Sequence, residues 1–310
     1  MKRYSIFLII ILVACTVRAQ NRKYLTNFSQ FQQYFNPALT GYQGTAIKSY
    51  YRDQWSGFDH APKTMFVAGE MNLADVTKAK NKLLQHGFGV VLLHDTYGAQ
   101  VENQLALSYG SGVQLTEGIY LKAGIALTYN NFKIDQDKLA MDDYTDPSYL
   151  DLVNGQNKNN HYGINVGVAL TSADYYAAYT LNDVIKKEGN ENQGIVTPYV
   201  MQHVLQAGYR REVAESIGLI INGIYRYDKS QKGIVEGQLK GVLSNTLWVG
   251  VGYRNDIAYT FNAGVRIRQI QVAYAREMSS GKVDGVYRGG NEITLSYHFK
   301  PVFGKKLSVW

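Results

Sequence analysis

Residues of alternating polarity recur along the chain after position 100, in runs of about ten residues. The run 119–130 places Leu121 and Leu127 on one side and Lys122 and Thr128 on the other. A period of two puts the two sets on opposite faces of one strand. The same pattern returns at 162–170, 217–225, 247–253, 259–265, 270–274 and 293–299. Many such segments, each with one apolar face, are typical of a transmembrane antiparallel β-barrel.

The pattern predicts about 14 strands. Their expected ranges are 45–53, 64–71, 87–95, 101–114, 118–132, 161–170, 174–180, 199–211, 215–227, 233–241, 246–254, 257–265, 268–276 and 289–299. An even number of strands returns both chain termini to one side of the membrane, which is the periplasm in bacterial outer-membrane barrels.

Connection lengths agree with this strand count. Every second connection is short, and we expect these to be the periplasmic turns: Leu115–Glu117, Thr171–Ala173, Glu212–Ala214, Val242–Asn245 and Arg266–Ile267. The stretches 133–160, 181–198 and 277–288 are long and polar, as external loops are. The Lys-rich connection 72–86 is long although it falls on the periplasmic side, which indicates a short amphipathic helix or a partner contact.

Composition supports the barrel over other classes of fold. The chain has 310 residues with 30 Gly, 25 Tyr and 5 Pro, and no apolar run after the N-terminus is long enough for a helical span. Many of the tyrosines lie near expected strand ends, where an amphipathic ring rests at the headgroup level. The alternative is a soluble β-sandwich, but so many strands would not each need an apolar face. Glycines on the expected inner face would leave interior space.

The N-terminus has the features of an export signal. Lys2 and Arg3 precede the apolar run 6–13, and Val17-Arg18-Ala19 carries the small residues that a signal peptidase reads. A lipoprotein-type cut before Cys15 is the alternative. Cleavage after Ala19 leaves a mature chain without cysteine, which excludes disulfides and thiol chemistry.

The expected organisation has four parts. Residues 1–19 form the signal peptide, 20–44 a periplasmic or plug segment, 45–299 the barrel, and 300–310 a C-terminal tail. The expected location is the outer membrane, with outer-membrane lipid around the barrel wall.

Candidate catalytic and ligand-binding chemistry is sparse. The 6 histidines include no pair at metal-ligand spacing. His94-Asp95 could form a relay with Ser108, but no Gly-x-Ser-x-Gly motif supports it. The acidic residues of 135–146 lack the spacing of a preformed Ca²⁺ site. A formal net charge of +7, part of it in the signal peptide, is too mild to indicate nucleic-acid binding. We therefore expect no enzymatic activity, no metal and no other cofactor.

The region before the first long alternating run has a different composition, with many aromatic residues, Gly, Asn and Pro. Its motifs are Asn36-Pro37-Ala38 with Gly41, then Tyr51-Arg52 and Gln54-Trp55 with Gly57-Phe58, and Ala61-Pro62-Lys63-Thr64. Farther along lie Gly87-Phe88-Gly89 and the closing segment Glu292–Phe299. These motifs resemble the PorP/SprF family of outer-membrane proteins, which is associated with type IX secretion and gliding motility in Bacteroidetes. The tail 300–310 departs from the family, and it leaves the barrel-assembly signal at either Phe299 or Trp310.

The resemblance implies a binding role on the family motif. The implied partner-binding residues are Asn36, Pro37, Gly41, Arg52, Gln54, Trp55, Gly57, Phe58, Pro62 and Thr64. An Asn-Pro pair also starts a turn, and this structural role is the simpler interpretation of Asn36 and Pro37. Arg52 can stack on Trp55 and pair with Asp53 or Asp59.

Two functions from different classes follow. In the first, the barrel works with the type IX machinery and binds either a secreted surface protein that carries a C-terminal sorting domain or periplasmic secretion components. In the second, it is a porin-like or ligand-specific transport channel. The two differ in whether 20–44 fills the lumen.

Overall fold

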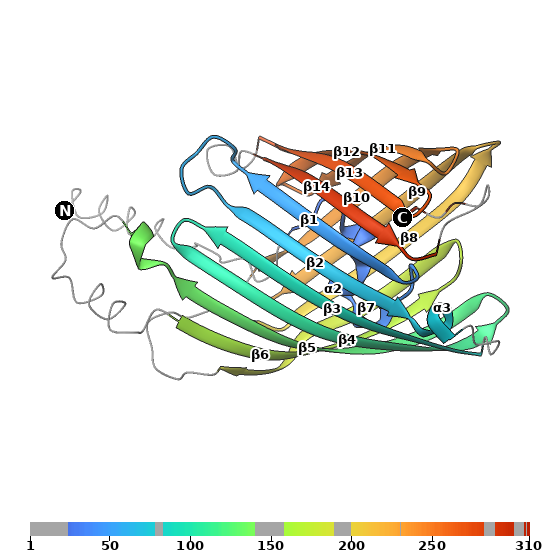
Figure 1. Cartoon of the computed structure of the whole chain (residues 1–310), viewed down its shortest axis with the longest axis horizontal. Helices are drawn as coiled ribbons and strands as arrows, with labels where there is room; N and C mark the ends of the chain where they lie inside the picture. The colour runs from blue at the N-terminus through green and yellow to red at the C-terminus, as the bar shows by residue number, and fades with distance from the viewer. Residues whose placement is uncertain are drawn as a thin grey trace, which may run out of the picture.

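The computed structural model describes residues 24–77, 83–139, 158–188, 200–229, 231–281, 289–300, 307 and 309–310. The strands form one tilted barrel wall, and the N-terminal residues of the described chain lie inside it (Figure 1). The signal peptide 1–19 and much of the predicted long loops lie outside the described residues. No helix in the described parts is long and apolar enough to cross a membrane.

The wall consists of fourteen antiparallel strands. They are β1 (Ala46–Gln54), β2 (Lys63–Asn72), β3 (Leu84–Tyr97), β4 (Gln100–Thr116), β5 (Ile119–Ile134), β6 (Lys158–Thr171), β7 (Tyr175–Glu188), β8 (Gln202–Ala214), β9 (Ile217–Asp228), β10 (Gln231–Leu243), β11 (Leu247–Arg254), β12 (Ala258–Ile267), β13 (Ile270–Ser279) and β14 (Gly290–His298). Each strand pairs with its neighbours in sequence, and β1 pairs with β14 to close the barrel. The strands expected from the pattern are all present, so the predicted fold class is confirmed.

The two ends of the barrel differ. We call the end that carries the turns after β4, β6, β8, β10 and β12 the turn end, and the opposite end the loop end. The turn-end connections are as short as expected, for example two residues between β12 and β13. Some loop-end connections are also short, since only 98–99 separate β3 from β4. Strand β7 extends to Glu188, beyond the end at 180 that the alternation predicts. A bulge at Asp183, which has a φ of 55°, lets the pairing with β6 continue that far.

The outer face of the wall is apolar, as the alternation predicts. Leu121, Leu127 and Val168 are exposed, whereas Lys122 and Thr128 between them are buried in the lumen. Aromatic pairs lie on the outer face near both ends, with Tyr129–Tyr162 and Tyr253–Tyr259 toward the loop end and Phe88–Tyr109 and Tyr297–Phe299 toward the turn end. An apolar band between two aromatic girdles is the surface that a bilayer requires.

Residues 24–44 lie inside the lumen, and we call this segment the plug. It contains η1 (Phe28–Gln30), α2 (Gln32–Phe35) and η2 (Pro37–Leu39), and the residues of these short helices are all buried. The plug begins near the loop end, where Tyr24 contacts Arg226 and Arg254, and it ends near the turn end, where β1 starts.

The plug supplies the barrel with its apolar core. Phe31 packs edge-on against Tyr50 and Phe66 of the wall, with ring centroids 5.7 and 5.0 Å apart, and Tyr34 packs edge-on against Phe66. The described end of the tail, Leu307 with Val309 and Trp310, belongs to a second cluster of buried residues near the turn end. The lumen is therefore a packed interior over the described residues.

The expectation that lumenal glycines leave interior space is wrong. A Cβ at Gly124 would overlap the backbone of Pro37 and Ala38, and a Cβ at Gly167 would overlap the Asn36 side chain. These glycines allow the plug backbone to approach the wall closely.

The unusually long turn-end connection contains the predicted short helix, α3 (Leu73–Thr77). Its Asp75 carboxylate accepts a hydrogen bond from the backbone N–H of Thr45 at 2.9 Å, just before β1, and pairs with Lys300 at 2.5 Å, just after β14. The helix therefore joins the two strands at which the barrel closes.

The assignment of the turn end to the periplasm gives a labelling prediction. Asp256 and Ser216 are both exposed turn residues with positive φ, at the loop end and the turn end respectively. In a chain whose Cys15 is replaced by Ser, we expect Asp256→Cys to react with a membrane-impermeant maleimide on intact cells. Ser216→Cys should react only after the outer membrane is permeabilised. The reverse pattern would invert the orientation.

Candidate functional site

The family motif is divided between three places in the structure. Asn36, Pro37 and Gly41 belong to the plug, Arg52 and Thr64 point into the lumen from β1 and β2, and the rest form the hairpin between these strands. The hairpin residues are Gln54, Trp55, Gly57, Phe58 and Pro62.

Asn36 and Pro37 fix the plug against the wall. The Asn36 amide donates to the carbonyl oxygens of Val168 and Tyr179, at 3.3 and 3.1 Å, and its side-chain oxygen accepts from the Ala38 N–H at 2.8 Å. Asn36 thus caps η2 while it binds two strands, and Pro37 begins η2 as expected for a turn-forming pair. Both residues are buried among residues of the same chain.

Gly41 lies at the turn-end exit of the plug. It has a φ of 72°, and a Cβ there would lie 3.1 Å from the carbonyl oxygen of Met71 and 3.2 Å from the Cα of Gly87. Its N–H donates to the Glu70 carboxylate at 3.1 Å. Glycine is required here by both the backbone conformation and the close approach of β2 and β3.

Arg52 belongs to a charged layer that follows the inner face of the wall from β9 to β1, near the loop end. We define the charged layer as Arg226, Glu236, Arg254, Glu277, Arg52 and Glu292, all of them buried. Consecutive members alternate in sign and form ion pairs: Arg226–Glu236 at 3.2 Å, Glu236–Arg254 at 2.9 Å, Arg254–Glu277, Glu277–Arg52 at 2.5 Å and Arg52–Glu292 at 3.7 Å. The expected pairing of Arg52 with Asp53 or Asp59 and its stacking on Trp55 are wrong, because Arg52 points into the lumen.

The charged layer binds the start of the plug. The Tyr24 ring lies between the guanidiniums of Arg226 and Arg254, each 4.5 Å from its centroid. Arg52 donates to the Tyr24 carbonyl oxygen at 2.5 Å, and Thr26 donates through its N–H and hydroxyl to Glu292. Burial raises the pKa of Tyr24, although the two guanidiniums lower it, so the phenol is neutral.

The charged layer was not found from the sequence, although a signal for it exists. Five of its members alternate with outward-facing residues on their strands and lie close to the loop end: Arg226, Glu236, Arg254, Glu277 and Glu292. Charged residues that interrupt the inward face at the same height on neighbouring strands could have indicated a buried network.

Thr64 faces the lumen from β2. Its hydroxyl donates to the Asp95 carboxylate of β3 at 2.5 Å, and both residues are buried. The candidate relay of His94, Asp95 and Ser108 is not formed. His94 is on the outer face beside Asn103, whereas Ser108 faces the lumen and bonds Thr40. His94 and Ser108 therefore lie on opposite sides of the wall.

The hairpin between β1 and β2 projects from the loop end. The Gln54 N–H donates to the Pro62 carbonyl oxygen at 3.0 Å and closes its base. Trp55, with a φ of 57°, donates its N–H to Gly289 and packs edge-on against Tyr97 at 5.9 Å. These contacts give Trp55 the role of a brace between the hairpin and its neighbours.

Phe58 and Gly57 form the tip of the hairpin. Phe58 is 51% exposed, and Gly57 has a φ of 95° with open space where a Cβ would lie, because no neighbouring atom comes within 4 Å of that position. The Phe58 backbone closes a turn with Trp55, through an N–H to carbonyl bond of 3.2 Å. The tip therefore presents an aromatic ring held by a braced backbone.

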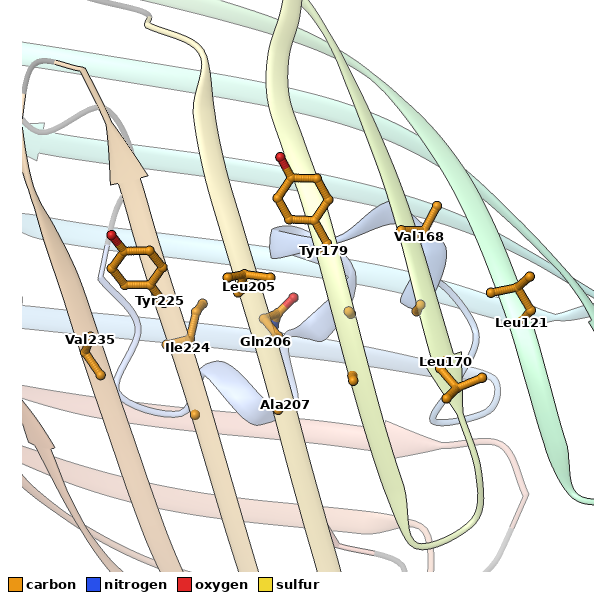
Figure 2. A pocket seen from close by; sticks show the side chains of 14 residues that line it. Leu121, Val168, Leu170, Tyr179, Leu205, Gln206, Ala207, Ile224, Tyr225 and Val235 are labelled. Carbon is orange, nitrogen blue, oxygen red and sulfur yellow. The ribbon is translucent and has the colours of Figure 1, made fainter.

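A shallow apolar groove, with a volume of about 610 Å³, lies on the outer wall. Small residues form its floor along one hydrogen-bonded row, Ala177–Ala207–Gly223. Figure 2 shows the larger side chains Tyr179, Leu205, Tyr225 and Val235 along one edge of it, with the plug behind the wall. The groove lies on the outer face of the wall and not in the lumen.

Metal chemistry has no support from the described residues. Within them, no group of three or more His, Cys, Asp or Glu side chains is positioned to hold a metal ion. The acidic residues from 140 to 146 lie outside the described residues.

Comparison with known proteins identifies the family. Residues 17–297 match the family described as type IX secretion system membrane protein PorP/SprF. The chain belongs to the PorP/SprF family. No curated protein matches the sequence. The family match and the closed barrel together make this protein an outer-membrane β-barrel.

Solved structures with the same architecture are outer-membrane barrels of low sequence identity. The CymD monoaromatic hydrocarbon channel is 10% identical with a TM-score of 0.52, over 86% of this chain and 92% of that one. Omp33 of Acinetobacter baumannii is 8% identical with a TM-score of 0.47, over 82% and 96% of the two chains. The Pseudomonas putida toluene transporter TodX is 10% identical with a TM-score of 0.46, over 89% and 93%. At such identity the likeness concerns the fold alone.

The close approach of the plug to the wall can be tested with a matched pair of glycines. Gly124→Ala places a methyl group against Pro37 and Ala38, whereas Gly237→Ala adds one on the open outer face. We expect the first to destabilise the barrel by about 1–3 kcal/mol, as overpacking does, and the second to be nearly neutral. Loss of heat-modifiable migration at a lower temperature for Gly124→Ala measures the difference. Equal behaviour of the two variants would contradict a tightly packed plug.

Proposed function

We propose that this PorP/SprF barrel is a non-enzymatic docking protein of the outer membrane. It binds a secreted surface protein with a C-terminal sorting domain, or components of the type IX machinery, and it does not conduct solutes. Its binding surface is the tip of the β1–β2 hairpin at the loop end.

The observation that carries the proposal is the filled lumen. The plug is buried along its length from Tyr24 to Gly41, and it is fixed at the loop end by the charged layer and near the turn end by Asn36. Withdrawing the plug would remove the bonds that Tyr24 and Thr26 make to the buried Arg52 and Glu292. Leaving a buried polar group unsatisfied costs about 1–3 kcal/mol, and more for a charged one, so this arrangement favours a permanent filling. A porin-like channel requires a continuous aqueous path instead.

The hairpin supplies the surface that a docking protein needs. Phe58 is exposed on a backbone braced through Trp55 against Tyr97 and Gly289. Aromatic anchors dominate the energetics of many interfaces, and a preorganised anchor loses little conformational entropy on binding. The tip lies beyond Gln54 and Gly290, the last pair that closes the barrel, so its side chains can be changed without loss of the fold.

Conductance separates this proposal from the porin-like alternative. The purified full-length protein in a planar lipid bilayer should give no stable conductance steps, because the plug and the packed tail occupy the lumen. A variant that lacks residues 24–44 and still migrates as a folded barrel should conduct. Ohmic steps from the intact chain would favour the transport function.

Partner recovery tests the hairpin. Phe58→Ala, and more strongly Trp55→Ala with Phe58→Ala, should weaken recovery of a surface or secretion partner with the tagged barrel. Removal of an anchor typically costs about 2 kcal/mol, which is roughly a thirtyfold loss of affinity.

A control hairpin guards against general effects of loop mutation. Asn255→Ala with Asp256→Ala changes the turn between β11 and β12 and should leave recovery unchanged. Heat-modifiable migration must show that every variant is folded. Undiminished recovery with a folded Phe58→Ala barrel would contradict the assignment.

A further inference from the structure

The described end of the tail lies inside the barrel, although it is no part of the wall. β14 ends at His298, and Phe299 is exposed on the outer face. Leu307, Val309 and Trp310 are buried at the turn end of the lumen, next to the end of the plug. They are held there by side-chain contacts, without strand pairing.

The Trp310 indole is enclosed by two tyrosine rings and a guanidinium. Its ring packs edge-on against Tyr176, with centroids 5.0 Å apart, and lies 5.9 Å from the Tyr42 ring. The Arg210 guanidinium lies 4.4 Å from the centroid of the Trp310 ring. A cation on the face of tryptophan is the strongest of the aromatic–cation pairings.

Two cations bind the tail backbone. Arg210 donates to the Val309 carbonyl oxygen at 3.3 Å, and the Lys240 ammonium donates to the Trp310 carbonyl oxygen at 3.0 Å. Lys240 is fully buried, and its other acceptor is Ser29 Oγ of the plug at 2.8 Å. In the described chain no side-chain carboxylate lies within ion-pair distance of Lys240. A buried ammonium needs acceptors, so an empty pocket would attract another peptide oxygen.

A third contact holds the Leu307 side chain, three residues before Trp310. Leu307 fills the space over Gly218 of β9, where any larger side chain would overlap it. The pocket thus has one subsite for an apolar side chain, one for an indole, and two cationic donors for the intervening backbone.

We propose that the turn end of the lumen is a peptide-binding site for an apolar segment that carries a tryptophan three residues after a leucine, and that the chain's own Leu307, Val309 and Trp310 occupy it. The tail is then an internal ligand, and a segment of the same chemistry from another protein binds when the tail is withdrawn. This site is separate from the hairpin tip and lies at the opposite end of the barrel.

A peptide-binding experiment tests the proposal. The purified barrel is prepared as the full chain and as a chain that stops after Lys300. The probe is a fluorescein-labelled peptide with the sequence of residues 305–310, followed by fluorescence anisotropy. We expect the shortened barrel to bind the peptide saturably and the full chain to bind it at least tenfold more weakly, because its site is filled. Equal binding by both, or no binding by a folded shortened barrel, would overturn the proposal.

Matched variants test which contacts make the site. A peptide with Ala in place of the terminal Trp should bind roughly thirtyfold more weakly, since it loses the ring contacts. On the shortened barrel, Arg210→Gln should weaken binding about tenfold, whereas Arg211→Gln, whose side chain lies on the outer face, should not. Equal effects of the two substitutions would contradict the assigned pocket.

A measurement on the full chain applies even if the shortened barrel does not fold. With Cys15 replaced by Ser, a Val309→Cys chain should react slowly with maleimide, and adding Arg210→Gln should accelerate the reaction at least tenfold. Adding Arg211→Gln should leave the rate unchanged. Fast labelling of Val309→Cys alone would show that the tail does not occupy the site.

Discussion

A strand that crosses a bilayer must find partners for every backbone N–H and C=O group, and this requirement closes the wall into a ring through β1 and β14. A ring of fourteen strands is wider than its own inward side chains can fill, since about eight strands is the size at which they suffice. The interior therefore has to be packed from elsewhere. The plug and the tail supply that packing, and the charged layer and the glycines on the inner face are shaped to hold the plug.

The two ends of the lumen are filled by different chemistry. Near the loop end, Tyr24 and Thr26 bind an alternating network of arginines and glutamates, in which each charge has a neighbour of opposite sign. At the turn end most contacts are apolar and aromatic, while Arg210 binds the Val309 carbonyl oxygen and Lys240 bridges Ser29 and Trp310. Hydrogen bonds from Tyr24 and Thr26 to these charged side chains fix the start of the plug because their geometry is specific, whereas the apolar contacts at the turn end are less directional. This difference is consistent with the proposed exchange of the tail at the turn end.

The wall could be predicted from the sequence almost completely, because a period of two is imposed by lipid on one face of every strand. The runs around Leu121 and Val168 needed no tertiary information. The interior could not be predicted in the same way. Arg52 has acidic neighbours in sequence, but its partners Glu277 and Glu292 are brought to it only by barrel closure. The tail carries no periodic signal, and the position of Trp310 depends on Tyr42, Tyr176 and Arg210, which are distant in sequence.

The position of Trp310 imposes an order on assembly. Its ring lies against Tyr42, and the lysine that binds its carbonyl oxygen also binds Ser29, so part of the pocket is contributed by the plug. The remaining walls come from β7, β8, β9 and β10, and the tail itself follows β14. The tail can therefore reach its place only after the plug is inside and the neighbouring strands are paired. A docked tail therefore requires that both the plug and the strands β7 to β10 are already in place.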